Sequence, residues 1–125
     1  MTPLDLAAGS RENLRVHQSV TSTNDVARDW VAGGAADAAT VVADFQTRGR
    51  GRTGREWKSP PGAGLALSQV FFAPPESLRL VPLLGALAAR AAIADHLPEV
   101  MPVGIKWPND IQVLGFKVAG ILTET

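Results

Sequence analysis

The sequence predicts an α+β fold, in which a mixed, largely antiparallel sheet packs with helices. Apolar runs typical of strands alternate with helical patterns in the order strand, helix, strand, loop, strand, helix, hairpin. No internal repeat, linker or low-complexity tract divides the chain. A chain of 125 residues therefore fits one domain, which is large enough to bury a substantial core.

The first half of the chain predicts two strands with a helix between them. A run of alternating apolar residues indicates a strand that ends at Val20. Ser22, followed three residues later by Asp25, has the pattern of a capping box that opens a short helix, and Gly33-Gly34 end that helix. The β-branched, apolar run Thr40–Phe45 predicts a buried second strand.

The second half predicts a strand, a helix and a hairpin. Gly64–Phe72 is expected to form the strand, and the dense leucine and alanine pattern from Leu80 to Leu97 predicts a buried helix. Val103–Val113 and Phe116–Thr125 then predict two strands. A tight turn at Leu114-Gly115 joins them.

Charge is concentrated in one segment. The chain has 12 basic and 12 acidic residues, but residues 48–58 hold five of the bases and one acid. A protein that holds a polyanionic nucleic acid usually has a broad basic face. A single basic cluster on an otherwise acidic chain favours a small anionic ligand and predicts no nucleic-acid partner larger than a mononucleotide.

Composition also predicts the compartment. Cysteine is absent, which excludes disulfides, thiolate metal sites and thiol nucleophiles and is compatible with the cytosol. Met1–Ser10 lacks a secretory pattern, and the longest uncharged apolar stretch, Leu80–Ala89, is shorter than the ~20 residues of a membrane span. We therefore expect a soluble cytoplasmic protein with no membrane partner.

The stretch Gln46–Lys58 is the densest polar feature, with five basic residues and three glycines. Glycine lets backbone N–H groups approach a ligand, and the guanidinium fork matches phosphate and carboxylate geometry. Its spacing is neither a dinucleotide-binding fingerprint nor a P-loop. Residues 47–57, the arginine-glycine loop, are predicted to clamp an anion, while a solvated loop or an RNA-binding segment stays open as an alternative.

Other polar groups stand out against apolar surroundings. Ile105–Asp110 contains a cation, an aromatic ring, an amide and a carboxylate next to one another. Pro108 favours a bulge or the edge of a sheet over the middle of a strand. The alternative is that the block is only a turn with a surface ion pair. Lys117 heads a strand and is expected to share one face with Ala119 and Ile121. A lone strand lysine is otherwise typical of edge protection.

Taken together, these blocks resemble the catalytic domain of biotin protein ligases over roughly residues 13–125. The combination of the arginine-glycine motif with the lysine-tryptophan-proline-asparagine-aspartate block is specific to that family. The matching residues are Ser22-Thr23-Asn24, Gln46, Gly49-Arg50-Gly51-Arg52-Thr53-Gly54-Arg55, Trp57, Lys106-Trp107-Pro108-Asn109-Asp110 and Lys117-Val118-Ala119-Gly120-Ile121-Leu122.

The resemblance implies a two-step reaction that uses ATP and Mg²⁺. The biotin carboxylate attacks the α-phosphorus of ATP, which gives biotinyl-5′-AMP and pyrophosphate. A lysine amine of a biotin carboxyl carrier protein then attacks the mixed anhydride and releases AMP. Two anions meet in the first step, so the protein has to supply preorganised cations rather than a nucleophile.

The resemblance also assigns roles to residues. It implies catalytic roles for Arg52 and Lys117, and a magnesium site at Asn109 and Asp110. Thr53 stands where other members carry a basic or larger residue, which lowers the local charge. The implied biotin-binding residues are Ser22, Thr23, Asn24, Gln46, Arg50, Gly51, Arg52 and Lys117, and the implied nucleotide-binding residues are Arg52, Arg55, Trp57, Lys106, Asn109 and Asp110.

Ligases of this family continue beyond the point that corresponds to Thr125, and some begin with a DNA-binding domain. We expect this chain to be a partial catalytic domain without the DNA-binding domain, the rest of the catalytic domain and the small C-terminal β domain, and to be impaired in biotin transfer. The alternatives are a lipoate or octanoate ligase or transferase of the same fold group, or a biotin-binding module without full turnover. The sequence does not define the oligomeric state or the roles of His17 and His96.

Overall fold

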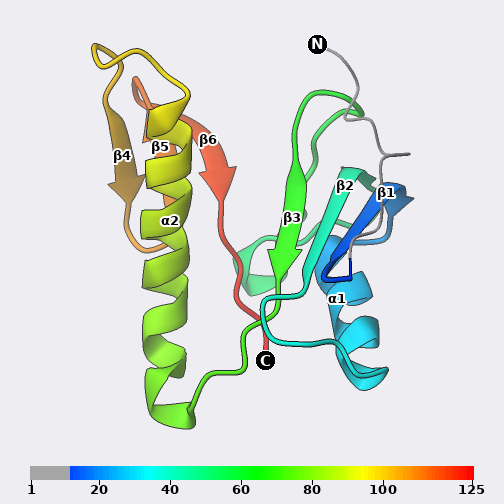
Figure 1. Cartoon of the computed structure of the whole chain (residues 1–125). Coiled ribbons are helices and arrows are strands. Elements are labelled where there is room, and N and C mark those ends of the chain that lie inside the picture. The colour runs from blue at the N-terminus through cyan, green and yellow to red at the C-terminus, as the bar shows by residue number, and fades with distance from the viewer. Residues whose placement is uncertain (1–11) are drawn as a thin grey trace. The chain divides into compact units, whose positions relative to one another are not determined.

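The computed structural model describes residues 12–125 and divides after Phe72 into two compact units. Each unit holds one three-stranded sheet, and each sheet has its own helix (Figure 1). One sheet mixes parallel and antiparallel pairs, and the other is antiparallel throughout. The α+β prediction, with mixed and largely antiparallel strands, is confirmed, although the strands are shared between two sheets.

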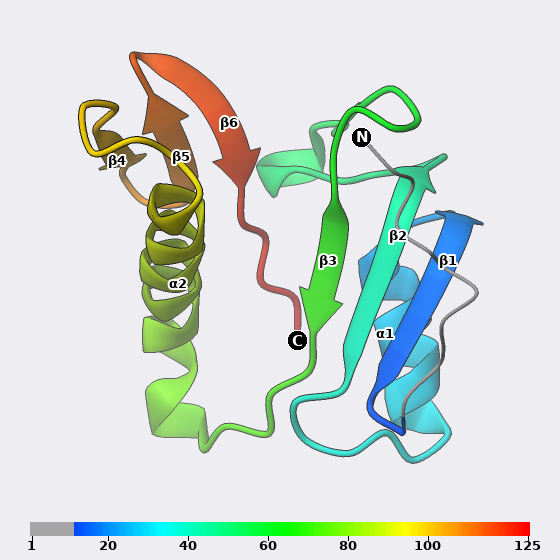
Figure 2. The same ribbon diagram turned by 45° about the horizontal axis from the view of Figure 1, so that its top comes forward.

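The first unit contains β1 (Leu14–Val20), α1 (Thr23–Ala32), β2 (Thr40–Gln46) and β3 (Ala66–Gln69). The strands lie in the order β1-β2-β3, with β1 parallel to β2 and β2 antiparallel to β3. Helix α1 connects the parallel pair and packs against β2 and β3 (Figure 2). This topology brings the start of α1 next to the C-terminal end of β2.

Local signals in the sequence explain the bounds of α1. The Ser22 side chain accepts a hydrogen bond from the backbone N–H of Asp25 at 3.0 Å, so the predicted N-cap is confirmed. Gly33 caps the C-terminus, and Gly34 follows with φ of 103°, a conformation that glycine adopts at little cost. The helix buries Ala27, and the sheet buries Val41 and Ala43.

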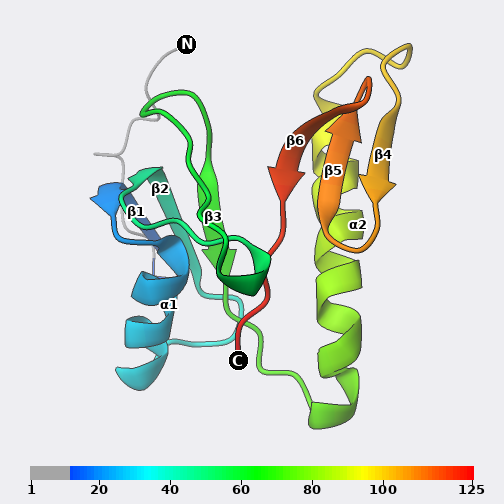
Figure 3. The same cartoon turned by 180° about the vertical axis from the view of Figure 1, so that it is seen from behind.

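The second unit contains η3 (Pro75–Leu80), α2 (Val81–Asp95), β4 (Val103–Lys106), β5 (Asp110–Val113) and β6 (Phe116–Gly120). The three strands form an antiparallel sheet in sequence order, and α2 packs against β4 and β5 (Figure 3). The centre of this core consists of the buried residues Ala86, Val103, Ile111 and Val113.

The sequence-based boundaries are wrong in three places in this unit. The expected strand Val103–Val113 is two strands, β4 and β5, because Trp107-Pro108 lies in the turn between them and proline cannot donate to a ladder. The expected helix from Leu80 to Leu97 is α2 preceded by the 3₁₀ helix η3. The expected strand Phe116–Thr125 ends as β6 at Gly120.

A β-bulge decides which way Lys117 faces. Lys117 pairs with Gln112 and Ala119 pairs with Ile111, so the register shifts between these two pairs. Residues opposite one another share a face of the sheet, and Ile111 and Gln112 face opposite sides. The prediction that Lys117, Ala119 and Ile121 share one face is therefore wrong: Ala119 is on the core side, and Lys117 is on the side of Gln112.

One helical stretch of the described chain is long and apolar enough to cross a membrane, judged by length and composition alone. It runs over Pro75–Asp95, with a mean hydropathy of 1.5. No membrane segment was expected, because the uncharged run Leu80–Ala89 within this stretch is by itself too short to span a membrane. A single such helix is weak evidence for a membrane span, and only 6% of the apolar window is buried, although Ala86 of α2 packs against β4 and β5.

Candidate functional site

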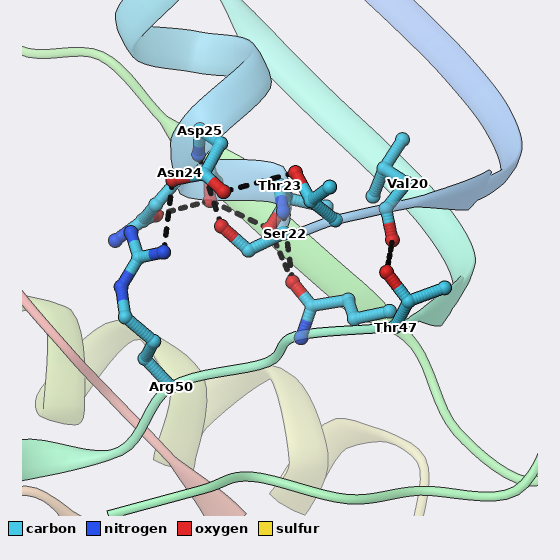
Figure 4. Close-up of polar contacts among 10 residues, drawn as sticks. Val20, Ser22, Thr23, Asn24, Asp25, Thr47 and Arg50 are labelled. Carbon is cyan, nitrogen blue, oxygen red and sulfur yellow. Dashed lines mark hydrogen bonds and ion pairs between the residues drawn. The ribbon is translucent and has the colours of Figure 1, made fainter. Parts of the chain in front are cut away.

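The start of α1 and the end of β2 form a polar cluster. Gln46, the last residue of β2, accepts hydrogen bonds at Oε1 from the Thr23 backbone N–H at 2.8 Å and from Thr23 Oγ1 at 3.2 Å (Figure 4). The two residues are 23 positions apart in the sequence and meet because β2 ends where α1 begins. Two of the predicted biotin-binding residues are thus in direct contact.

Ser68 completes this cluster, although it was not predicted as a site residue from the sequence. It lies on β3, donates from Oγ to Thr23 Oγ1 at 2.7 Å and is also hydrogen-bonded to Asn24 Oδ1. Among the described residues, the buried polar side chains are Ser22, Thr23 and Ser68, and all three lie here. Burying hydroxyl groups is costly unless they are hydrogen-bonded, and all three are bonded here, so we take this cluster as the candidate site. A serine inside the apolar run Leu65–Val70 was the available signal.

The arginine-glycine loop is folded into a hairpin. At its base, Thr47 and Arg48 donate backbone hydrogen bonds to Val20 O at 2.9 Å and Thr21 O at 2.8 Å. Across the hairpin, Trp57 donates to Gly49 O at 2.8 Å and Gly51 donates to Arg55 O at 2.7 Å. The tip is a short 3₁₀ turn, η2 (Arg52–Gly54), with Arg52 and Arg55 exposed.

The first two glycines of this loop differ in their surroundings. A Cβ atom on Gly49 would lie 2.5 Å from Trp57 O and 2.8 Å from Gln46 Nε2, which is too close for either contact. A Cβ atom on Gly51 would lie 3.5 Å from Arg55 Cβ, an ordinary contact. Packing within the protein therefore requires glycine at position 49 but not at position 51.

Arg50 connects the loop to α1. Its Nη1 atom lies 2.8 Å from Asp25 Oδ1, with 35% and 40% of the two side chains exposed. Partial burial alone would raise the pKa of Asp25, but hydrogen bonds from Arg50, Thr21 and Ser22, together with the charge of Arg50, outweigh it and hold the pKa below its ordinary value. Asp25 is therefore ionised at neutral pH.

The predicted residues of the second unit surround the turn between β4 and β5. Asn109 donates from Nδ2 to Ile121 O at 3.0 Å and accepts from the Ile121 N–H at 2.9 Å, so it fixes the chain after β6. Lys117 Nζ lies 3.1 Å from Asp110 Oδ1, which places both on one side of the sheet. Trp107 is 73% exposed, and Lys106 is exposed as well.

The two histidines differ in their surroundings. His17 Nε2 on β1 is buried and has no hydrogen-bond partner within residues 12–125. His96 Nδ1 contacts Ala92 O at 2.8 Å, one turn back along α2. No group of three His, Cys, Asp or Glu side chains within the same residues could hold a metal ion.

The predicted site residues thus fall into two groups, one in each unit. The group in the first unit offers hydroxyl and amide groups beside an arginine-rich hairpin. The group in the second unit offers a lysine-carboxylate pair next to a structural asparagine. Within the first unit, the hydroxyl and amide groups suit an uncharged polar group of a ligand, and the arginines suit a negative charge.

Comparison with known proteins gives the family. Residues 16–125 match the Biotin/lipoate A/B protein ligase family, and the chain belongs to it.

Two relatives illustrate the similarity. The bifunctional ligase/repressor BirA of Bacillus subtilis is 39% identical over 115 residues, which cover 90% of this chain and 35% of that protein. The biotin–[acetyl-CoA-carboxylase] ligase of Mycobacterium tuberculosis is 34% identical over 122 residues, covering 94% of this chain and 46% of that protein. The chain therefore spans less than half the length of either relative.

Solved structures agree with this result. The biotin protein ligase from Leishmania major in complex with biotinyl-5-AMP superimposes with a TM-score of 0.79 at 35% identity, covering 93% of this chain and 53% of that one. The biotin protein ligase from Aquifex aeolicus in complex with biotin and ATP gives a TM-score of 0.74 at 35% identity, with 92% and 47% covered.

Proposed function

We propose that this chain supplies the biotin-binding part of a biotin protein ligase, an enzyme that activates biotin with ATP and transfers it to a lysine of a biotin carboxyl carrier protein. The observation that carries the proposal is the hydrogen-bonded cluster of the buried Thr23 and Ser68 with the half-buried Gln46, beside the arginine-glycine loop. The names of the relatives and of the solved structures favour biotin as the substrate.

The cluster suits the head group of biotin. A cyclic urea carries two N–H donors and one carbonyl acceptor, and hydroxyl and amide side chains offer both functions. Ser22, Thr23, Asn24 and Gln46 would bind this head group, and Ser68 would hold Thr23 and Asn24 in place. A rigid hydrogen-bonded cluster binds with a smaller loss of side-chain entropy than a mobile one.

Activation brings two anions together. A biotin carboxylate oxygen forms a bond to the α-phosphorus of ATP while the bond to pyrophosphate breaks. Arg50, Arg52 and Lys117 would balance the negative charge of the carboxylate and α-phosphate, and Gly51 would let the loop backbone approach. Trp57 and the exposed Arg55 and Lys106 would contact the nucleotide.

Transfer needs a neutral amine. The lysine nitrogen of the carrier attacks the carbonyl carbon of biotinyl-5′-AMP, the bond to the phosphate oxygen breaks, and AMP leaves. Water competes with the amine for the anhydride, so the residues of this chain would have to hold the anhydride and exclude water.

The groups in the β4-β5 turn are compatible with Mg²⁺ but do not form a complete site. Mg²⁺ commonly binds one or two carboxylates together with substrate phosphates. Asp110 supplies a carboxylate, while the Nδ2 atom of Asn109 is used on Ile121 O. Asp110 and Asn109 would hold the ion, which would neutralise phosphate charge. We infer that the protein acts in the cytoplasm, where biotin, ATP and carrier proteins are available.

ATP–pyrophosphate exchange distinguishes the substrates. The purified chain, ATP and Mg²⁺ are incubated with labelled pyrophosphate and either biotin, lipoate or octanoate. We expect exchange with biotin alone, reduced about 10²- to 10³-fold in Arg52→Ala and Lys117→Ala, because each removes a cation from the developing charge. Arg79→Ala, which removes an exposed arginine from η3, is the control.

Other outcomes would change the assignment. Exchange with lipoate or octanoate instead would favour the other branch of the family. Binding of biotin without exchange would favour a binding module.

A further inference from the structure

Asn109 and Ile121 form one more pair at the end of the β5-β6 ladder. The Ile121 N–H donates to Asn109 O at 2.9 Å, and Asn109 Nδ2 donates to Ile121 O at 3.0 Å. Opposite residues of an antiparallel ladder can exchange both bonds through their backbones. Asn109 lies in the turn before β5, and its side-chain amide supplies the second bond. The pair therefore extends the ladder beyond Asp110 and Gly120.

The β5-β6 ladder changes register at a bulge. The four residues of β5 lie opposite the five residues of β6, so one residue of β6 is extra. Ile111 pairs with Ala119, whereas a regular ladder from the same turn would pair it with Val118. The Asn109–Ile121 pair continues the shifted register, because each step back along β5 is matched by one step forward along the chain of β6.

The apolar residues of β6 and of the segment after it fit either register. Side chains alternate between the two faces of a strand. The observed register turns Ala119 and Ile121 toward the core, where both are partly buried. A regular register would turn Val118 and Leu122 toward the core instead. Both sets contain a large aliphatic side chain, so hydrophobic burial distinguishes the two registers only weakly, and hydrogen bonds at the end of the ladder gain weight.

We propose that Asn109 is a positioning residue that selects the bulged register of β6 through its side-chain amide. Strand β6 carries Lys117, whose Nζ atom lies 3.1 Å from Asp110 Oδ1. A bulge bends its strand and changes the direction of the side chains next to it, so the register decides how Lys117 faces Asp110. The consequence for catalysis rests on the proposed function of Lys117, whereas the register of β6 does not depend on it.

The proposed role depends on the chemistry of the amide. A carboxylate of the same size accepts hydrogen bonds and donates none. Asn109→Asp would therefore place an oxygen against Ile121 O, and Asn109→Ala would remove the side-chain donor altogether. Within residues 12–125, β6 pairs with β5 alone (Figure 3). No second strand of this part of the chain fixes its register.

Two other accounts of these residues make different predictions. If packing alone set the register, both variants would keep it. Ile121 packs beside α2, where a Cβ atom on Gly85 would lie 3.3 Å from Ile121 Cγ2. If Asn109 acted only as an ion ligand, it would act through its oxygen, which Asn109→Asp retains. That variant would then keep both the register and the activity.

The first test is nuclear magnetic resonance of the chain without ligand. In the wild type, we expect backbone contacts between Ile111 and Ala119 and none between Ile111 and Val118. Both Asn109→Asp and Asn109→Ala should add a second set of β6 signals that shows the Ile111–Val118 contact. The Ile121 amide should exchange about two- to ten-fold faster in both variants, the range that one hydrogen bond supports.

A matched control changes an amide to a carboxylate elsewhere. Asn13 is exposed just before β1, so Asn13→Asp should leave the signals of β6 unchanged. A single wild-type register in both variants at position 109 would overturn the proposal. Loss of the contacts between β4 and β5 together with those of β6 would also overturn it, because the effect would then be general unfolding of the second unit.

The second test measures ATP–pyrophosphate exchange with biotin and rests on the proposed function. A misplacement of about 1 Å can cost about 10²-fold in rate, so both variants at position 109 should lower kcat by about 10- to 10²-fold, with KM for biotin within about two-fold. Exchange at the wild-type rate in Asn109→Asp would overturn the proposal. If the wild-type chain shows no exchange, the proposed function fails, while the magnetic resonance measurement still decides the role of Asn109.

Discussion

Gly49 and Gly51 are two glycines of the arginine-glycine loop, and the structure gives them different roles. Gly49 is buried where the loop closes against Trp57 and Gln46. Gly51 has space for a methyl group, and its φ of −101° is accessible to any residue. The first glycine is required for folding of the hairpin, and the second is expected to matter for the ligand.

Alanine substitutions separate these roles. Gly49→Ala should lower the free energy of unfolding by about 1–3 kcal/mol, because the new Cβ forces the backbone at Trp57 to shift. Gly51→Ala should change it by less than about 0.5 kcal/mol and weaken biotin binding. Denaturant unfolding and titration calorimetry measure both effects. Equal destabilisation by the two substitutions would contradict the assignment.

Leu114 is a residue in an unfavourable backbone conformation. Its φ is 52°, Gly115 follows with φ of 80°, and the leucine side chain is 60% exposed. Hairpin turns with two positive φ values favour asparagine followed by glycine. The tight turn at these two residues was correctly predicted, because glycine gives a local signal.

Replacing Leu114 by asparagine should therefore stabilise the protein. We expect Leu114→Asn to raise the free energy of unfolding by about 0.5–1 kcal/mol, since asparagine tolerates this conformation. Leu114→Ala, which shortens the side chain and keeps the Cβ, should give no such gain. Thermal and denaturant unfolding of the three proteins decide the matter, and equal stabilisation by alanine would point to the exposed side chain instead of the backbone.

Short-range signals also explain which residues could be assigned from the sequence. The Ser22–Asp25 cap was predictable because it depends on residues three positions apart. Ser68 was not, because its partners are Thr23 and Asn24, more than 40 positions away. The side on which Lys117 lies was mispredicted, because a bulge has no clear sequence signal.

At the level of elements, the arginine-glycine loop was recognised by its composition, but the bonds that close it were not. Its base is held by Val20 and Thr21, which depend on the parallel pairing of β1 with β2. The turn between β4 and β5 was predicted as part of a strand although Pro108 interrupts the ladder, and Asp110 forms its ion pair with Lys117 of β6 rather than within the block. Only the folded structure shows that this ion pair joins Asp110 to Lys117.

The ion pair between Asp25 and Arg50 predicts a pH dependence. A lowered pKa means that Asp25 stabilises the folded first unit above its ordinary pKa of 3.8, and that this contribution is lost as pH falls through the lower folded value. Arg50 stays protonated, and the other contacts of Asp25 are the hydroxyl groups of Thr21 and Ser22. The charge of Asp25 therefore sets the pH range.

Denaturant unfolding across this range tests the assignment. The free energy of unfolding of the wild type should exceed that of Asp25→Asn from neutral pH down to about pH 4. The difference should disappear at lower pH. A difference that already vanishes between pH 7 and pH 5 would show that another group is responsible.

At the scale of the whole molecule, the α+β class was predictable because strand and helix patterns are local and alternate along the chain. The division into two compact units after Phe72 was not, because Pro74-Pro75 gives the same signal for a turn within one domain as for a boundary between units. The first unit contains the polar cluster and the arginine-glycine loop, and the second contains the Lys117–Asp110 pair.

We propose that the residues of this chain activate a biotin carboxylate as an adenylate. Mass spectrometry after incubation with biotin, ATP and Mg²⁺ tests it most directly, because the adenylate itself is detected. We predict biotinyl-5′-AMP from the wild-type chain and a reduction of about 10²-fold or more in Arg52→Ala and Lys117→Ala. A folded chain that binds biotin and ATP but yields no biotinyl-5′-AMP would contradict the claim.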